Sequence, residues 1–109
     1  MERLMAAILD RKAHPSDRSY TSHLLEGGVD KIGEKIVEEA AEVVEAAAEP
    51  GSEGREHLVR EAADLVYHLL VMLAARDAEL ADVASELARR VGISGLDEKA
   101  SRNPGKRPS

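Results

Sequence analysis

Two pairs of acidic residues constrain what this chain can fold into more than any other feature. The pairs are Glu39-Ala-Ala-Glu42 and Glu61-Ala-Ala-Asp64, and both lie in segments rich in Ala, Val and Leu. Residues three positions apart project from one face of a helix, and Ala, Glu and Leu all favour helix. Pro50-Gly51 stands between the pairs and predicts a break. The sequence therefore predicts two successive helices that each present two carboxylates.

Each acidic pair borders an apolar face of its helix. At about 100° per residue with Glu39 at zero, the apolar residues fill an arc from about 20° to about 160°, and Glu42 falls at about 300°. With Glu61 at zero, the second arc runs from about 20° to about 180°, and Asp64 falls near 300°. If the two apolar faces pack together, the four carboxylates converge. The arcs include Ile32, Ile36, Val37, Val43 and Val44 in the first helix and Leu58, Val59, Leu65, Leu69 and Leu73 in the second.

Four converging carboxylates repel one another unless a cation lies between them. Ligands that are all oxygen suit Mg²⁺ or Mn²⁺, and Mg²⁺ commonly takes substrate phosphates as further ligands. The hypothesis is a magnesium site for phosphate chemistry. The alternative is two solvated acidic faces on ordinary helices, with Lys35–Glu39 and Arg60–Asp64 ion pairs at i, i+4 spacing.

Composition narrows the class of protein. A chain of 109 residues is one small domain, and its 43% hydrophobic content includes no Phe and no Trp. Long helices with broad apolar faces are expected to be covered in a homodimer. The net charge of −6 argues against a nucleic-acid surface, and the absence of Cys excludes thiolate metal sites. No signal peptide and no membrane span is evident, so the expected location is cytoplasmic.

The expected fold is all-α, with about four helices in a single domain over residues 1–93. The helices are predicted at 2–12, 29–49, 55–76 and 80–91, with a loop at 50–54. Residues 18–25 are polar, are expected to end in a short helical turn before a break at Gly27-Gly28, and form either a connector or a substrate-facing loop. Residues 94–109 are a basic tail whose end is expected to be disordered. In this tail, Lys99 and Arg102 are candidates for binding substrate phosphates.

His68 follows Asp64 by one helical turn. It is either a metal ligand or proton shuttle, or a polar residue at the edge of the core. A di-iron carboxylate protein is disfavoured, because such bundles use Glu-x-x-His and Leu65 occupies the position three residues before His68.

Several stretches together resemble the phosphoribosyl-ATP pyrophosphohydrolases, a family of the all-α MazG-like nucleotide pyrophosphohydrolases. The acidic pairs match the E-x-x-E and E-x-x-D mark of that superfamily. The narrower match is carried by SYTS at 19–22, GGVDKIGEK at 27–35, EEAAE at 38–42, EAADLVYHLL at 61–70 and EKASR at 98–102.

The resemblance implies a MazG-like helical bundle completed by dimerisation. It also implies Mg²⁺-dependent hydrolysis of phosphoribosyl-ATP to phosphoribosyl-AMP and pyrophosphate, the second step of histidine biosynthesis. On this hypothesis Glu39, Glu42, Glu61 and Asp64 hold the metal, Glu38 or Glu39 activates water, and Lys35, Lys99 and Arg102 contact phosphate. The alternatives are a house-cleaning pyrophosphohydrolase of (deoxy)nucleoside triphosphates and a non-catalytic helical interaction module.

Overall fold

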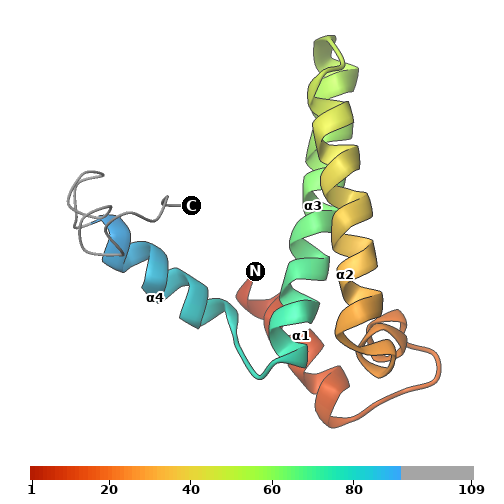
Figure 1. Cartoon of the computed structure of the whole chain (residues 1–109), viewed down its shortest axis with the longest axis vertical. Helices are drawn as coiled ribbons and strands as arrows, with labels where there is room; N and C mark the ends of the chain where they lie inside the picture. Colours follow the sequence, from red (N-terminus) through yellow and green to blue (C-terminus); the bar gives the residue numbers. More distant parts are fainter. Residues whose placement is uncertain (92–109) are drawn as a thin grey trace.

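The computed structural model describes residues 1–91, and this part of the chain consists of four helices with no strand (Figure 1). The helices are α1 (Glu2–Ala13), α2 (Tyr20–Ala47), α3 (Gly51–Ala75) and α4 (Leu80–Val91). The all-α prediction is confirmed. Helices α2 and α3 form a long antiparallel hairpin, α1 crosses its lower end, and α4 extends away from it (Figure 1). The predicted tail, including Lys99 and Arg102, lies outside the described residues.

Helix α2 begins nine residues earlier than the position 29 predicted from the sequence. Ser19 is its N-cap, and the Ser19 side chain accepts a hydrogen bond from the backbone N–H of Ser22 at 3.1 Å. The break expected at Gly27-Gly28 is a kink inside the helix, where Gly28 has φ 80° and ψ −175°. Only glycine adopts this backbone region at low cost. The helical turn expected at the end of residues 18–25 is confirmed, and it is longer than expected because the Ser19 cap starts the helix at Tyr20.

The predicted loop at 50–54 was wrong, since α3 already begins at Gly51 with Pro50 as its N-cap. Proline is compatible with the start of a helix because the first N–H groups of a helix need no intrahelical partner. Gly54 is buried in the first turn of α3, and a Cβ at this position would collide with the backbone carbonyl of Glu49. The glycine therefore lets the start of α3 pack directly against the end of α2.

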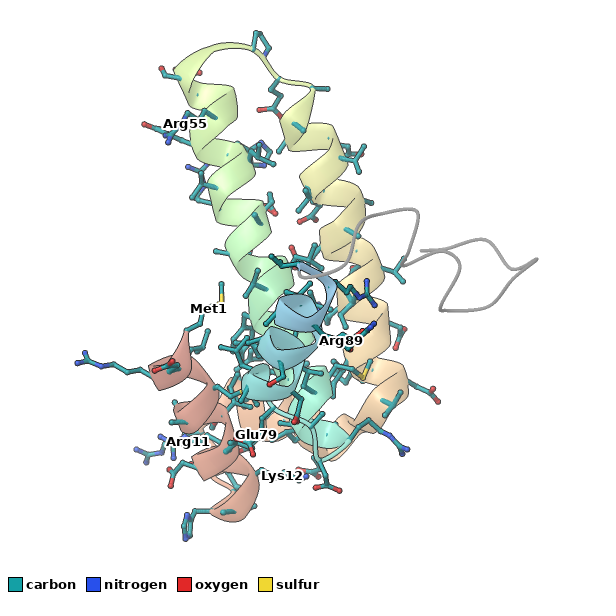
Figure 2. All side chains as sticks on the ribbon, turned by 90° about the vertical axis from the view of Figure 1, so that its left-hand side faces the viewer. Met1, Arg11, Lys12, Arg55, Glu79 and Arg89 are labelled. Atoms are coloured by element: carbon teal, nitrogen blue, oxygen red, sulfur yellow. The ribbon has the colours of Figure 1, made fainter. Side chains whose placement is uncertain are left out.

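The core lies where α1 crosses the hairpin, at the end opposite Arg55 in Figure 2. Its buried apolar residues are Met5 and Ile8 from α1, Leu24 and Ile32 from α2, and Leu70, Val71 and Ala74 from α3. Farther along the hairpin, Val37 and Val44 are each 71% exposed, and Val59 is also exposed. Within one chain, packing therefore buries Ile32 of the two apolar arcs and leaves these three valines exposed.

Lys12 joins α1 to the end of α3 (Figure 2). Its ammonium group donates to the carbonyl of Ala74 at 2.6 Å and pairs with Asp77 at 2.5 Å. Helix α4 has the predicted bounds and presents Val83, Leu87 and Val91 to solvent. In the part of the chain that the structure describes, no helix combines the length and the apolar character needed to cross a bilayer.

Candidate metal centre

The two acidic pairs meet in the hairpin between α2 and α3. Glu39 from α2 and Glu61 and Asp64 from α3 each offer one carboxylate oxygen, and these oxygens lie within 4.8 Å of one another. Because α2 and α3 run side by side, residues more than twenty positions apart in sequence reach a common point. We call Glu39, Glu61 and Asp64 together with the adjacent Glu42 the acid cluster.

Glu42 is not one of the three residues with converging oxygens, yet its carboxyl group affects the pKa values of two of them. Glu42 is the largest cause of the raised pKa of Glu61, and after burial it is the next cause of the raised pKa of Glu39. The structure therefore brings three of the four predicted acids to a common point, and Glu42 lies within electrostatic reach of Glu39 and Glu61.

Burial and like charges make this cluster unfavourable when it is fully ionised. Burial, followed by the neighbouring Glu42 and Asp64 carboxylates, raises the pKa of Glu39 to about 7. The Glu61 side chain is only 15% exposed. One oxygen of each residue, Oε2 of Glu39 and Oε2 of Glu61, is buried without any hydrogen-bond donor among the described residues. Buried carboxylate oxygens without donors are costly.

These properties fit a divalent cation. Every available ligand is a carboxylate oxygen, which is the donor type that Mg²⁺ and Mn²⁺ prefer. A cation at the common point would supply positive charge to carboxylates that include two buried oxygens without donors, and it would offset the repulsion that raises the pKa values. Cysteine and histidine donors are absent from the converging set, so it does not resemble a zinc site.

Protein cations do not neutralise the cluster in the way the alternative interpretation required. Lys35 pairs with Glu38 at 3.5 Å rather than with Glu39. Within residues 1–91, Arg60 and Asp64 form no ion pair. Glu38 is largely exposed and lies outside the converging set, so the structure separates it from Glu39. An open cavity of about 610 Å³ runs beside Lys35 along α2, and Lys31, Glu34 and Glu38 are among the residues that line it.

His57 is a site residue that the sequence reasoning missed. Its Nδ1 lies 3.0 Å from each carboxylate oxygen of Glu49, and its Nε2 lies 3.7 Å from Oε1 of Glu61. The hydrogen bond with Glu49 is the main cause of the raised pKa of His57. The i, i+4 spacing of His57 and Glu61 was visible in the sequence, whereas the contact with Glu49 depends on the hairpin turn.

His68 does not reach the metal position. It is 5% exposed, its Nδ1 lies 2.8 Å from the backbone carbonyl of Asp64, and its Nε2 lies 3.2 Å from the hydroxyl of Tyr20. A carbonyl only accepts, so Nδ1 carries the hydrogen and neutral Nε2 accepts from Tyr20. Because both ring nitrogens are engaged, the geometry favours the edge-of-core interpretation over the ligand interpretation.

Comparisons with known proteins agree with this geometry. A family model described as phosphoribosyl-ATP pyrophosphohydrolase matches residues 1–91. A phosphoribosyl-ATP pyrophosphatase of Rhodopirellula baltica is 52% identical over 109 residues, which is all of this chain and 90% of the relative. The phosphoribosyl-ATP pyrophosphatase of Dinoroseobacter shibae is 54% identical over 102 residues, covering 94% of this chain and 97% of the relative. The phosphoribosyl-ATP pyrophosphatase of Cereibacter sphaeroides is 52% identical over 102 residues, covering 94% of this chain and 96% of the relative.

Proposed function

Because the chain belongs to the phosphoribosyl-ATP pyrophosphohydrolase family, as the sequence resemblance predicted, we propose that it hydrolyses phosphoribosyl-ATP to phosphoribosyl-AMP and pyrophosphate. This reaction is the second step of histidine biosynthesis. One observation of the structure supports it above all others: carboxylate oxygens from Glu39, Glu61 and Asp64 converge within 4.8 Å. Such a cluster is suited to a cation that binds a triphosphate.

In this proposal Glu39, Glu61 and Asp64 hold Mg²⁺, with Glu42 beside them, and Mn²⁺ is a possible substitute. When bound, the ion neutralises the charge that develops on the phosphate oxygens as the phosphoanhydride breaks. The acids from two helices hold this position rigidly, because α2 and α3 are packed against each other along the hairpin. A rigid ligand set favours correct positioning of substrate.

The reaction needs a base for the attacking water. Water oxygen forms a bond to phosphorus, the anhydride P–O bond breaks, and the bond electrons leave with the pyrophosphate. Glu38 and Glu39 are the two candidates to accept the water proton. Glu38 pairs with Lys35 outside the acid cluster, whereas Glu39 lies within the cluster, beside the position proposed for the metal and the substrate phosphates. These facts favour Glu39.

Substrate phosphates also need positive partners on the protein. Lys35 borders the open cavity of about 610 Å³ on α2, one helical turn before Glu39. We propose that it contacts a phosphate and exchanges its exposed partner Glu38 for the substrate. Lys99 and Arg102 are proposed for the same role from the sequence alone, since they lie outside residues 1–91.

A second copy of this chain is the proposed partner, as a homodimer. Val37, Val44, Val59 and Leu69 are exposed on the hairpin, and Leu87 and Val91 are exposed on α4. Exposed apolar residues this numerous on a small domain indicate a covered surface in the assembly. Sedimentation should show a dimer, and Val44→Glu should shift it toward monomer.

We further propose a cytoplasmic location, because the substrate and product are highly charged nucleotides.

Turnover by acid-cluster variants tests the proposed activity. Glu39→Gln and Asp64→Asn should each lower kcat for phosphoribosyl-ATP by at least about 100-fold, since removal of one metal ligand or base commonly costs that much. Glu26→Gln, an exposed acid on α2 before the kink, is the matched control and should keep its activity. Circular dichroism should show the helix content of all three variants unchanged.

The alternatives give different results in the same assay. A house-cleaning enzyme would hydrolyse dUTP or dCTP much faster than phosphoribosyl-ATP with Mg²⁺ present. A non-catalytic interaction module would hydrolyse none of these nucleotides, and the acid variants would change only its stability. Faster turnover of the deoxynucleotides, or no turnover at all, would contradict the proposal.

A further inference from the structure

The structure brings the two tyrosines of the chain together. The sequence contains only two Tyr, with no Phe and no Trp. Tyr20 is the first residue of α2 and Tyr67 lies in α3, and their rings stack with centroids 6.2 Å apart and planes inclined by 20°. The imidazole of His68 meets both rings edge-on, at 6.1 Å from Tyr20 and 5.1 Å from Tyr67. All the large aromatic surface of the protein is therefore concentrated at one place.

Tyr20 is fixed in position although it is half exposed. Its hydroxyl lies 3.2 Å from Nε2 of His68, and the bond from Nδ1 of His68 to the Asp64 carbonyl makes the Tyr20 hydroxyl the donor. The neighbouring Thr21 side chain hydrogen-bonds the hydroxyl of Tyr67. Tyr20 nevertheless remains 50% exposed. An aromatic ring that is already ordered and still open loses little conformational entropy when a ligand covers it.

This aromatic group lies next to the acid cluster on both helices. His68 follows Asp64 by four residues, and Lys35 precedes Glu39 by four residues. One helical turn advances about 5.4 Å along the axis. The pKa of Lys35 is raised first by Glu38 and next by the Tyr20 phenol. The tyrosines thus lie about one turn from the acids, on the side nearer to α1 and beside the lysine assigned to phosphate.

A ribose separates the base of a nucleotide from its phosphates by several ångströms. A substrate whose phosphates are held at the acid cluster and Lys35 therefore carries its base at the distance of the tyrosine pair. We propose that the exposed face of Tyr20, supported by Tyr67 and His68, is the stacking site for the purine base of the substrate. The inference rests on the proposed function, because it takes the acid cluster as the phosphate site.

The small number of aromatic residues makes this site directly observable by NMR. In the full chain labelled with ¹³C-tyrosine, two ring systems are expected, and Tyr67→Phe identifies which belongs to Tyr20. The α,β-methylene analogue of ATP, added with Mg²⁺, should shift the Tyr20 ring signals through the ring current of the stacked purine. Inorganic triphosphate with Mg²⁺, which lacks the base, should leave them nearly unchanged.

Affinity measurements on two variants separate stacking from the hydrogen bond. Tyr20→Leu should weaken binding of the ATP analogue by about tenfold, in the range of base–aromatic stacking. Tyr20→Phe keeps the ring and loses only the bond to His68, so its affinity should stay within about threefold. The affinity of both variants for inorganic triphosphate should equal that of the unmodified protein. Calorimetry on the metal-loaded protein gives these dissociation constants without turnover.

Three results would overturn the inference. The Tyr20 signals could stay in place at saturating analogue, or Tyr20→Leu could lose affinity equally for the analogue and for inorganic triphosphate. The Tyr20 signals could also move only with protein concentration. The last result would mean that a second copy covers the ring. Failure of the proposed function looks different. A protein that does not hydrolyse phosphoribosyl-ATP but shows the Tyr20 shift and the selective loss in Tyr20→Leu would still support the stacking site.

Discussion

Lys35 forms its ion pair with Glu38, at 3.5 Å, and not with Glu39 on the adjacent position of α2. Among residues 1–91, this pairing leaves Glu39 without a cationic ion-pair partner, next to Glu42, Glu61 and Asp64. The Lys35 side chain is 38% exposed and pairs with the more exposed carboxylate of Glu38, and an ion pair of this kind contributes little to stability. Lys35 is available to contact an anionic substrate, while the acid cluster is available to bind a cation.

Replacing Lys35 should affect substrate binding much more than folding. We expect Lys35→Met to raise the KM for phosphoribosyl-ATP by about tenfold or more, because a charged hydrogen bond to phosphate is lost. Its free energy of unfolding should change by less than about 0.5 kcal/mol, as is usual for exposed ion pairs. Arg3→Met on α1 removes an exposed charge far from the site and is the control. A large loss of stability with an unchanged KM would contradict the assignment.

Mg²⁺ should stabilise the folded protein through the acid cluster. At a Mg²⁺ concentration 100 times the dissociation constant, binding to the folded state alone adds about 2.7 kcal/mol. For a domain of this size, that gain corresponds to a rise in Tm of about 10 °C. The rise should be absent in Glu39→Gln and in Asp64→Asn. NaCl at equal ionic strength is the control, and an equal rise with NaCl would show that the ion acts by screening alone.

Without metal, stability should fall as the pH rises from about 4.5 to about 7. The folded-state pKa of Glu39 is raised to about 7, so the folded protein retains a proton that the unfolded chain has already released. The protonated Glu39 contributes fully to stability at pH values below its unfolded-state pKa of 4.5. This contribution is lost as the pH rises through its folded-state pKa of about 7. Glu61, whose pKa is also raised, acts in the same direction. Urea midpoints measured with a chelator at pH 5 and pH 7 test the sign.

The variant Glu39→Gln cannot lose this proton, so its stability should depend less on pH over the same interval. His57 also has a raised pKa, and its effect has the same sign but begins only near its ordinary value of 6.5. The difference between the unmodified protein and Glu39→Gln below that pH therefore isolates Glu39. Glu86 and Asp77 have lowered pKa values and act only at more acidic pH. A metal-free protein that becomes more stable toward pH 7 would contradict this account of the cluster.

Two glycines of α2 should respond to alanine with opposite signs. Gly28 has φ 80° and ψ −175°, and a Cβ there meets no atom within 4 Å, so the cost of Gly28→Ala is backbone strain of about 1–3 kcal/mol. Gly33 is helical, and its Cβ would meet only Cε of Met72 at 3.8 Å. Gly33→Ala should therefore stabilise the protein by about 0.5–1 kcal/mol. Urea unfolding of both variants measures the difference, and two losses of equal size would contradict the helical assignment at Gly33.

The sequence by itself determined the features that depend on neighbouring residues. The i, i+3 spacing of Glu39 and Glu42, and of Glu61 and Asp64, places each pair on one face of its helix, whatever the packing of that helix in the tertiary structure. Gly and Pro positions predicted the two breaks, and the all-α class followed from helix-favouring composition and periodicity. The motifs also predicted the family, which the comparisons confirm. The bounds of α2 and α3 were missed because the Ser19 cap and the close approach at Gly54 outweighed the local breaking signals.

Only the tertiary structure decided which of these local features meet. Packing of α2 against α3 sets Glu39 beside Glu61 and Asp64 and brings Tyr20 onto Tyr67 and His68. It also leaves Val37 and Val44 exposed, although the helical projection placed them with the buried Ile32. The physical reason is that periodicity fixes the direction of a side chain around its own helix axis. The relative placement of two helices depends instead on contacts between residues far apart in the chain.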